Sequence, residues 1–496
     1  MHLLSPEISQ VDPRIRFLRS VLREHWRDAC GGETPAEALS VQHIAKVSDV
    51  SRPSVNKFND HLIAAGRGTH GLVRLEPMAG YVIGVDLRET HPVRVAVRDT
   101  HGRNLIKDRE VWEPETQPSS ARADDLLQVA AQGIKACTEH LPEMGLDKGR
   151  LLGIGISLPG PVKDGLVVGP KASPWDLVRA DLNLVRALGE QHLPDVDETD
   201  ARKRALKWAE SLVATQSDVY ATAVLEHLWG DSVDRAYPDR PLRDTVMIKW
   251  SFDLCAAAIL GGELHTGSGG MAGAIPHYKI DEDEIDDVER KLNESDLKLV
   301  RPPTCGFCAQ NDVPYADRCI HAWASLQYLS SLADPSSGPD RPAAEAIKQA
   351  VLENRSEVIE PLKLAAGGIG NVVAAYVGAV DPASVTLGGA VGARVFDAVE
   401  TSFVQRITSA FPGIDNTGLK VRGASLVTHT ATLGAAACAA LKIGPRRLAP
   451  FTEDLSAPKP KRGRPAKRNA TLDHDASTNG DNGRFEPSRG RKRSRA

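Results

Sequence analysis

Residues 80–105, with the sequence GYVIGVDLRETHPVRVAVRDTHGRNL, constrain the fold of this chain more than any other stretch. The apolar run at 82–85 ends at Asp86 and predicts a short buried strand. Along 93–98, valines alternate with arginines and an alanine, which is the two-residue period of a second strand. His101-Gly102 predicts the turn that follows. The stretch therefore predicts a β-hairpin, with a helical segment before it and alternating strands and helices after it.

The segment before the hairpin, residues 1–78, predicts three helices. The first, at 13–29, places its apolar residues on one face and most of its arginines elsewhere. Ser40 is a candidate N-cap for a short second helix, and Ser51 is a candidate N-cap for a third helix at 52–65. Two short helices joined by a tight turn form the plan of a helix-turn-helix motif.

The exposed face of the third helix predicts contacts with double-stranded DNA in its major groove. This face carries Arg52, Ser54, Asn56 and Lys57. Arginine can bind guanine and asparagine can bind adenine through paired hydrogen bonds, whereas lysine more often contacts phosphate. Residues 71–75 predict the strand of a wing beside these helices. The alternative interpretation is an ordinary helical hairpin with a solvated basic face.

Strand and helix patterns alternate from residue 80 to 444, which is typical of α/β architecture. The continuous apolar run at 151–157 predicts a buried strand, and LPGPV follows it as a turn. Residues 246–250 predict another strand, and an alanine-rich helix at 430–441 ends the region. We find no signal peptide and expect no membrane-spanning segment, so we expect a cytoplasmic protein.

The cysteine pattern indicates a metal site rather than disulfides. The chain has seven cysteines, an odd number, and three of them, Cys305, Cys308 and Cys319, cluster in the sequence. The C-x2-C pair presents two thiolates from one turn, and zinc takes four nitrogen or sulfur ligands in a tetrahedron. The alternative interpretation is three reduced cysteines in a loop.

Several phrases resemble the ROK family of repressors, open reading frames and sugar kinases. They are the hairpin with its D-x-x-G turn, VSDVSRPSVNKF at 47–58, SLPGPV at 157–162 and LGG at 387–389. The resemblance covers about residues 40–444. It implies an α/β fold with a duplicated, actin-like ATPase core of the ROK type. An all-α winged helix-turn-helix would precede this core, and a disordered tail would follow it.

The resemblance implies a core without enzymatic activity. Asp218 stands at the position of the family's general base, but both phosphate-binding loops are altered. Arg88 and Glu89 replace glycines in the first loop, and SFDLC at 251–255 replaces the glycine-rich turn of the second. We therefore expect no catalytic residues and no ATP. Ala274 replaces a sugar-binding glutamate, which favours a core that senses another effector or mediates oligomerisation.

The resemblance also implies a fourth metal ligand. The family's zinc motif combines three cysteines with a histidine from a G-H phrase, whose position His277 occupies. His277, Cys305, Cys308 and Cys319 would then hold a structural zinc ion with no open coordination position. His321 replaces a family glutamate and is a competing ligand.

The C-terminal segment, residues 445–496, predicts a disordered basic tail. It has 14 Lys and Arg against 6 Asp and Glu, which gives it a charge of +8. Because the whole chain has a net charge of −4, the rest of the chain has a charge of −12. Within 459–468, the run Lys461, Arg462, Gly463, Arg464 and Pro465 resembles an AT-hook, which binds the minor groove of A·T-rich DNA. The alternative is a generic polybasic tail that is attracted to phosphate.

Together these features predict three domains: a winged helix-turn-helix at 1–78, a ROK-like sensor and oligomerisation core at 80–444, and the tail at 445–496. The expected function is that of a transcriptional regulator, a repressor in the first place, that is nucleoid-associated and forms a homodimer or homotetramer. A sugar-responsive repressor, a sugar kinase and an architectural A·T-rich DNA-binding protein are the alternatives. The acidic stretch at 281–296 predicts a solvated helix or loop insertion with no assigned role.

Overall fold

The computed structural model describes thirteen stretches of the chain. They are residues 12–29, 39–68, 72–87, 92–116, 122–168, 175, 178–230, 244–252, 254–275, 277–334, 343–411, 418–426 and 428–449. All of the described residues belong to one compact unit. The AT-hook-like run at 459–468 lies outside the described residues, as do Arg88, Glu89 and Asp253.

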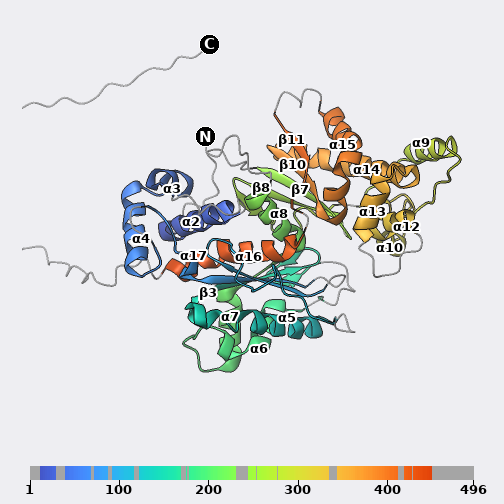
Figure 1. Ribbon diagram of the computed structural model, residues 1–496. Helices are drawn as coiled ribbons and strands as arrows, with labels where there is room; N and C mark the ends of the chain where they lie inside the picture. Colours follow the sequence, from blue (N-terminus) through green and yellow to red (C-terminus); the bar gives the residue numbers. More distant parts are fainter. Residues whose placement is uncertain are drawn as a thin grey trace, which may run out of the picture. The chain divides into compact units, whose positions relative to one another are not determined.

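The first lobe is built on a four-stranded sheet with the strand order β2-β1-β3-β6. Its strands are β1 (Tyr81–Asp86), β2 (Arg94–Asp99), β3 (Leu151–Leu158) and β6 (Val213–Ser217). The predicted hairpin is present, because β1 and β2 pair antiparallel with Val85 opposite Val95. Strands β3 and β6 extend the sheet in parallel. One face is covered by α5 (Ala123–Thr138), α6 (Ala180–Leu188) and α7 (Ala201–Leu212), as Figure 1 shows.

Glycines in the central strands let a helix approach the other face of this sheet very closely. That helix is α16 (Thr430–Lys442), and α8 (Asp218–Trp229) packs beside it. A Cβ atom added at Gly84 of β1 or at Gly155 of β3 would collide with backbone carbonyls of α16. The larger side chains of these strands, such as Ile83 and Ile154, pack toward α5–α7 instead.

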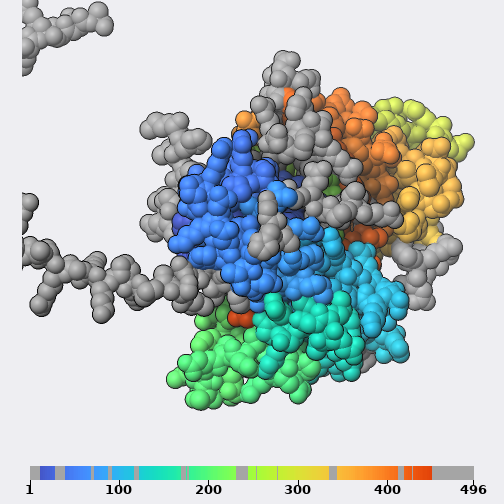
Figure 2. Space-filling model, turned by 60° about the vertical axis from the view of Figure 1, so that its left-hand side comes forward, coloured from blue at the N-terminus to red at the C-terminus, as the bar shows by residue number. Residues whose placement is uncertain are grey.

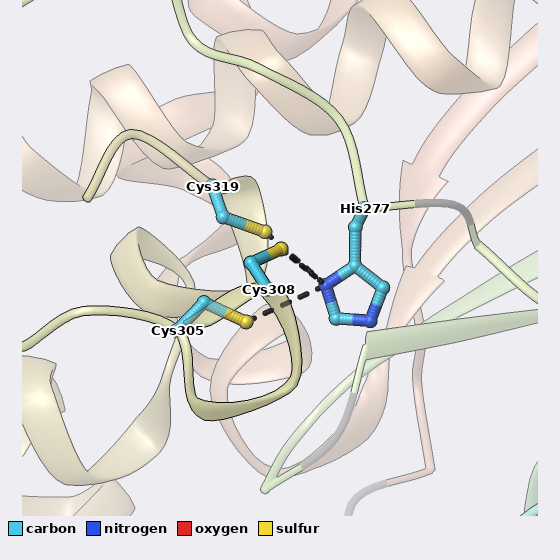
Figure 3. Close-up of side chains that lie close together, drawn as sticks. All are labelled: His277, Cys305, Cys308 and Cys319. Carbon is cyan, nitrogen blue, oxygen red and sulfur yellow. Dashed lines mark hydrogen bonds between the residues drawn. The ribbon is translucent and has the colours of Figure 1, made fainter. Parts of the chain in front are cut away.

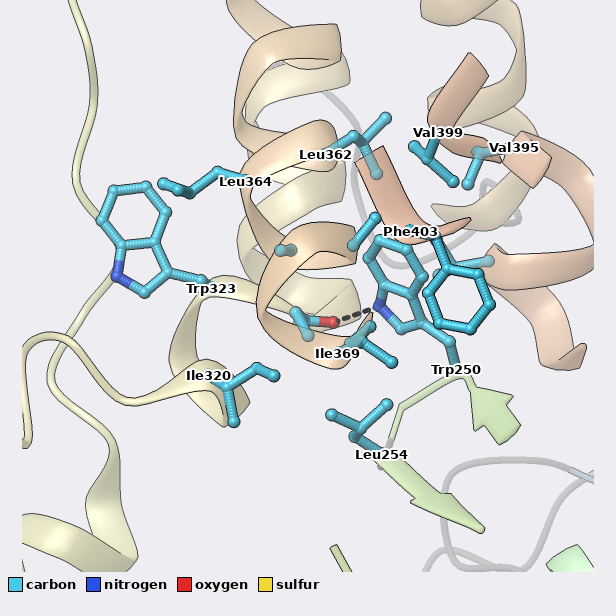
Figure 4. Close-up of a cluster of buried hydrophobic side chains, with 14 of the residues drawn as sticks. Trp250, Leu254, Ile320, Trp323, Leu362, Leu364, Ile369, Val395, Val399 and Phe403 are labelled. Carbon is cyan, nitrogen blue, oxygen red and sulfur yellow. Dashed lines mark hydrogen bonds between the residues drawn. The ribbon is translucent and has the colours of Figure 1, made fainter. Parts of the chain in front are cut away.

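The second lobe is built on a five-stranded sheet with the order β11-β10-β7-β8-β9. Its strands are β7 (Thr245–Trp250), β8 (Leu254–Leu260), β9 (Glu263–His265), β10 (Ser384–Gly388) and β11 (Lys420–Gly423). The long helix α15 (Gly389–Ala410) packs on it, and a second long helix, α14 (Ser356–Val380), packs against α15. Trp250, at the end of β7, is fully buried between them with Phe403, and its indole N–H donates to the carbonyl oxygen of Ala324 at 2.7 Å (Figure 4).

Short elements complete the two lobes. They are β4 (Val162–Lys163), β5 (Leu166–Val167), α9 (Glu282–Asn293), α10 (Gly306–Gln310), α11 (Ile320–Trp323), α12 (Leu326–Ala333), α13 (Ala343–Leu352), α17 (Gly444–Leu448) and the 3-10 turns at 77–79, 141–144, 148–150 and 190–192. The acidic stretch forms α9, and it is solvated on one face only. Ile285, Val288 and Leu292 are buried in the second lobe, and Glu284 pairs with Arg406 of α15.

Helix α14 bears on the expectation that the chain has no membrane-spanning segment. It is long and apolar enough to cross a bilayer by length and composition, although the sequence predicted no such segment. Of its most apolar window, 61% is buried inside the protein. It packs against α15 and the neighbouring helices α9 and α11–α13, and its apolar residues belong to the core of the second lobe, which accounts for its composition as a core helix.

The N-terminal segment forms three helices at the predicted positions, α2 (Pro13–Ala29), α3 (Val41–Ser48) and α4 (Arg52–Ala64). Gly66 follows α4 with a positive φ of 66°, as expected for a glycine that ends a helix. The predicted wing strand is not formed by the described residues 72–75. That stretch makes only isolated bridges, between Leu39 and Val73 and between Gly68 and Leu75.

Candidate functional site

Serine caps begin both α3 and α4, and the turn between the two helices is short. The Ser40 hydroxyl oxygen accepts a hydrogen bond from the backbone N–H of His43 at 3.0 Å, which caps α3. Asp49 follows the end of α3, and its left-handed φ of 52° turns the chain sharply. The Ser51 hydroxyl oxygen then accepts from the N–H of Ser54 at 3.4 Å and starts α4. Local sequence therefore determines the angle at which α4 leaves α3.

One face of α4 is buried, and the opposite face is open to solvent. Val55 and Leu62 are fully buried, and the Asn59 side-chain amide donates to the carbonyl oxygen of Leu72 at 3.1 Å. Arg52 and Lys57 are exposed, and so is Asn56. Figure 2 shows the N-terminal helices, in blue, together on one face of the molecule. A helix with such an exposed face can enter a DNA groove, because its long polar side chains point into solvent and can contact the DNA.

Ser54 is placed differently from the other three predicted contact residues. It is only partly exposed, and its hydroxyl lies 2.9 Å from that of Ser51. Its side chain therefore takes part in the N-terminal cap of α4.

A second group of side chains converges in the second lobe, although its members come from separated parts of the chain (Figure 3). The Nδ1 atom of His277 lies 3.3 Å from the Sγ atom of Cys319 and 3.4 Å from those of Cys305 and Cys308. The four ligand atoms all lie within 4.8 Å of one another. Backbone pairing between Lys279 and Cys319 brings the His277 segment and the cysteine segment side by side.

The geometry of this group fits a tetrahedral metal ion. Zn–S bonds near 2.3 Å and Zn–N bonds near 2.0 Å place nitrogen and sulfur about 3.5 Å apart across a tetrahedral ion. Burial lowers the pKa of His277 to about 4, with a smaller effect from His321, so the ring is neutral and its lone pair is available. Burial also raises the pKa of the Cys308 and Cys319 thiols. A cation would stabilise these sulfurs as thiolates.

His321 does not belong to this ligand group. Its Nε2 atom lies 3.2 Å from the carbonyl oxygen of Ile275, and its ring stacks on His277 at 4.2 Å. Phe307 also stacks on His277, at 4.3 Å, and the Tyr315 hydroxyl donates to the His277 carbonyl oxygen at 3.1 Å. These contacts orient the His277 ring with Nδ1 toward the three sulfurs.

Asp218, which the sequence resemblance predicted at the position of a general base, is held in a buried ion pair. Asp218 is 4% exposed, and its carboxylate pairs with the ammonium group of Lys249, which is also 4% exposed. Asp218 is the first residue of α8 in the first lobe, whereas Lys249 lies on β7 in the second lobe. The pair therefore joins the two lobes directly. Only the placement of a lysine in the otherwise apolar strand at 246–250 indicates this role in the sequence.

Two further contacts close the region around Asp218. The Tyr220 hydroxyl donates to the carbonyl oxygen of Ala272 at 2.5 Å, which ties α8 to the segment before His277. Beyond β7, the Ser251 hydroxyl oxygen accepts from the N–H of Ala390 at 2.8 Å. The turn after β7 and the start of α15 are thus bonded to each other.

Comparisons with known proteins place these features in a family. The model of the ROK family matches residues 82–442. Among curated proteins, none matches this chain. The fold is similar to the crystal structure of a ROK family transcriptional regulator, a homologue of the E. coli MLC protein, with 18% identity and a TM-score of 0.60. That match covers 89% of this chain and 100% of the other.

A second solved structure is a ROK family glucokinase from Streptomyces griseus in complex with glucose and AMPPNP. It has 19% identity and a TM-score of 0.50, and the match covers 72% of this chain and 98% of the glucokinase. At such identities both likenesses concern the fold. Because the family model spans far more than half of the 496 residues, the chain belongs to the ROK family.

Proposed function

We propose that this protein is a DNA-binding transcriptional regulator, a repressor in the first place, whose core has no kinase activity. The observation that carries the proposal is the exposed face of α4. Ser51 caps this helix, and Val55 and Leu62 anchor it in the core. Arg52 and Asn56 are exposed to solvent on its other face. In this proposal α3 and α4 form a helix-turn-helix, and α4 lies in the major groove. Arg52 and Asn56 bind base edges, and Lys57 binds phosphate.

The fold comparisons support a regulator. The likeness to the ROK transcriptional regulator covers 89% of this chain, whereas the likeness to the glucokinase covers 72%. The fold shared with the regulator therefore extends over a larger part of the chain than the fold shared with the enzyme.

The contacts around Asp218 support a core without phosphoryl transfer. A general base must be free to accept a proton from the substrate hydroxyl, but the Asp218 carboxylate is paired with Lys249. A phosphate loop must present free backbone N–H groups to the nucleotide. Here the loop that follows β7 begins with Ser251 in place of a glycine, and its hydroxyl accepts from the Ala390 N–H at the start of α15. Both features disfavour an ATP-dependent sugar kinase.

For the four-residue cluster we propose a structural zinc site. His277, Cys305, Cys308 and Cys319 would supply all four ligands and leave no open position for a reacting water. The ion would fix the cysteine segment against the segment that carries His277. Its role would be to stabilise the second lobe.

The tail and the assembly complete the proposal. Residues 461–465 would bind the minor groove of A·T-rich DNA and add affinity to the contacts of α4. A cytoplasmic homodimer or homotetramer would place two helix-turn-helix units on two half-sites of an operator.

Selection of fragmented genomic DNA on the full-length protein tests the proposal. We expect enrichment of palindromic sites. The double variant Arg52→Ala with Asn56→Ala should lose sequence preference, with a cost of about 1–3 kcal/mol for each base contact. Asp60→Ala, also exposed on α4, is the matched control and should keep the preference. Retained preference in the double variant would refute α4 as the recognition helix.

The same selection separates the architectural alternative. A protein that enriches only A·T-rich DNA, and loses this activity when 456–496 are deleted, would be an architectural binder and not a sequence-specific regulator.

A further inference from the structure

A small cavity lies where the N-terminal segment meets both lobes. Its walls come from α2, from α8 and α16 of the first lobe, and from the β8–β9 hairpin of the second lobe. Its volume is about 70 Å³. A water molecule needs about 10–15 Å³ on this measure, so the cavity has room for about five waters or for one small anion. It shares no lining residue with the Asp218–Lys249 pair or with the cysteine cluster.

The charged residues of this junction cavity are predominantly cationic. Arg19 and Arg23 reach it from α2, and Lys442 lies at the end of α16. The acidic residue among its lining groups is Glu263 of β9. Its Oε1 atom lies 3.4 Å from a guanidinium nitrogen of Arg19 and 3.1 Å from one of Arg23. Lys442 has no ion-pair partner among the residues that the structure describes.

The Glu263 contact is a weak one that another anion can replace. The Glu263 side chain is 51% exposed, so water screens its attraction to the arginines. Both arginines contact the same carboxylate oxygen in these pairs, which is not the two-oxygen geometry of a strong Arg–carboxylate pair. An incoming oxyanion can offer a separate oxygen to each guanidinium group.

His227 supplies a second, independent observation. It is 8% exposed and lines the cavity from α8. Among the described residues, its Nδ1 atom has no hydrogen-bond partner. Burial lowers the pKa of His227 to about 3, helped by the charges of Arg23 and Arg27, so the ring is neutral. A buried polar nitrogen needs a partner, which a molecule inside the cavity can provide.

We propose that this junction cavity binds a small oxyanion, of the carboxylate or phosphate class, which takes the place of Glu263 beside Arg19 and Arg23. With the anion bound, α2 would keep its contacts with the first lobe but lose its ion pairs with Glu263 of the β8–β9 hairpin. The anion would thereby change the orientation of the DNA-binding helices, which makes it an effector of the regulator. This last step rests on the function proposed above. The affinity for the anion and the affinity for DNA must then be coupled in both directions.

Calorimetric titration of the full-length protein, without DNA, tests the site itself. Inorganic phosphate and acetate are the probes, and chloride at matched ionic strength is the control anion. We expect saturable binding of at least one probe and a loss of about tenfold or more in Arg23→Gln. Arg290→Gln, at an exposed position of α9, is the matched control and should bind like the wild-type protein.

Glu263→Gln gives the sharpest result because it removes the internal competitor without removing a cation. An exposed ion pair contributes about 0.2–1 kcal/mol, so probe affinity should rise by up to about fivefold. Glu263 is half-exposed, so this variant should fold normally. If Glu263→Gln bound the probe anion with unchanged affinity, Glu263 would not compete for the site and the proposal would be overturned. Equal binding of the probe by Arg23→Gln and the wild-type protein would also overturn it, because the anion would then not bind in this cavity.

Operator binding with and without the probe tests the regulatory step. We expect operator affinity to change at saturating probe in the wild-type protein but not in Arg23→Gln. Anion binding that leaves operator affinity unchanged would overturn the effector role. Because the titration needs no DNA, a protein that fails to bind an operator would refute the proposed function without affecting the test of the site.

Discussion

Replacing Lys249 by methionine should strongly destabilise the folded protein. Met is close to the aliphatic part of Lys in length, so the variant removes the charge and keeps most of the packing. The Asp218 carboxylate, at 4% exposure, would then be a buried charge without its counter-ion. Breaking a buried pair from one side costs about 3–5 kcal/mol. Asp218→Asn should have a comparable cost, since it leaves the ammonium group of Lys249 unpaired.

A double-mutant cycle separates the pair from the packing around it. The double variant Asp218→Asn with Lys249→Met buries no charge and should cost several kcal/mol less than the sum of the two single variants. Urea unfolding followed by tryptophan fluorescence measures the difference, because Trp250 follows Lys249 and is fully buried. The midpoints are comparable only if the denaturant dependence stays the same among the variants.

An exposed pair on the second lobe provides the control. Arg290 pairs with Asp287 on α9, and Arg290→Met should leave the midpoint unchanged because water screens that pair. If Lys249→Met had an equally small effect, and the two single variants were additive, the Asp218–Lys249 pair would be open to solvent. The ion pair would then not join the lobes, and the argument against a free general base at Asp218 would fail.

Three further predictions concern the metal site, the buried histidines and the tail. The purified protein should contain one zinc ion per chain, and Cys308→Ser should lose the ion and unfold at a lower temperature, whereas Cys137→Ala should keep it. Burial lowers the pKa of His25 to about 2, so the fold binds fewer protons there than the unfolded chain, and stability falls as pH drops below about 6.5. His25→Gln keeps an acceptor for the Leu75 N–H and should reduce the slope of unfolding free energy between pH 6 and 5 by about 1.4 kcal/mol per pH unit. Deleting 456–496 should weaken binding to all DNA sequences and lower the dependence of the binding constant on salt; an unchanged salt slope would show that the tail makes no phosphate contacts.

Local sequence features predicted the elements that depend on neighbouring residues. Ser40 and Ser51 cap α3 and α4 as expected, because a cap needs only the three residues that follow it. The hairpin of β1 and β2 was likewise predictable, since its valines alternate within one short stretch. The three cysteines and His277 lie together, as the family resemblance implied. The spacing of the cysteines along the chain did not by itself predict how the four side chains are arranged.

Contacts between distant segments were not predictable in the same way. Nothing near Lys249 in the sequence indicates that β7 ends against the start of α8, so its pairing with Asp218 depends on how the two lobes pack. The role of α9 was predicted only in part. Its charges indicated a solvated helix, but Ile285, Val288 and Leu292 at helical spacing form a buried stripe that was visible in the sequence.

The packing of α2 explains how the core can influence the helices that we propose to bind DNA. On the first lobe the contacts are buried and aromatic, since Trp26 stacks on Trp229 at 5.8 Å and the Trp229 indole donates to the Trp26 carbonyl oxygen. On the second lobe, the ionic contacts of α2 are the exposed pairs of Arg19 and Arg23 with Glu263. Buried apolar contacts are much harder to separate than screened ion pairs.

The N-terminal helices must therefore move with the first lobe. His25 and His101 strengthen this attachment from either side of Leu75: the Leu75 N–H donates to His25 Nε2 at 3.1 Å, and His101 Nε2 donates to the Leu75 carbonyl oxygen at 2.6 Å. A rotation of the second lobe would strain the Asp218–Lys249 pair and the Glu263 contacts before it disturbed this clamp. A signal from the second lobe to α4 can then pass through Glu263, through the pair that joins the lobes or through the contact of Tyr220 with Ala272. At these places a single substitution should uncouple the proposed effector binding from the proposed DNA binding while α3 and α4 stay folded.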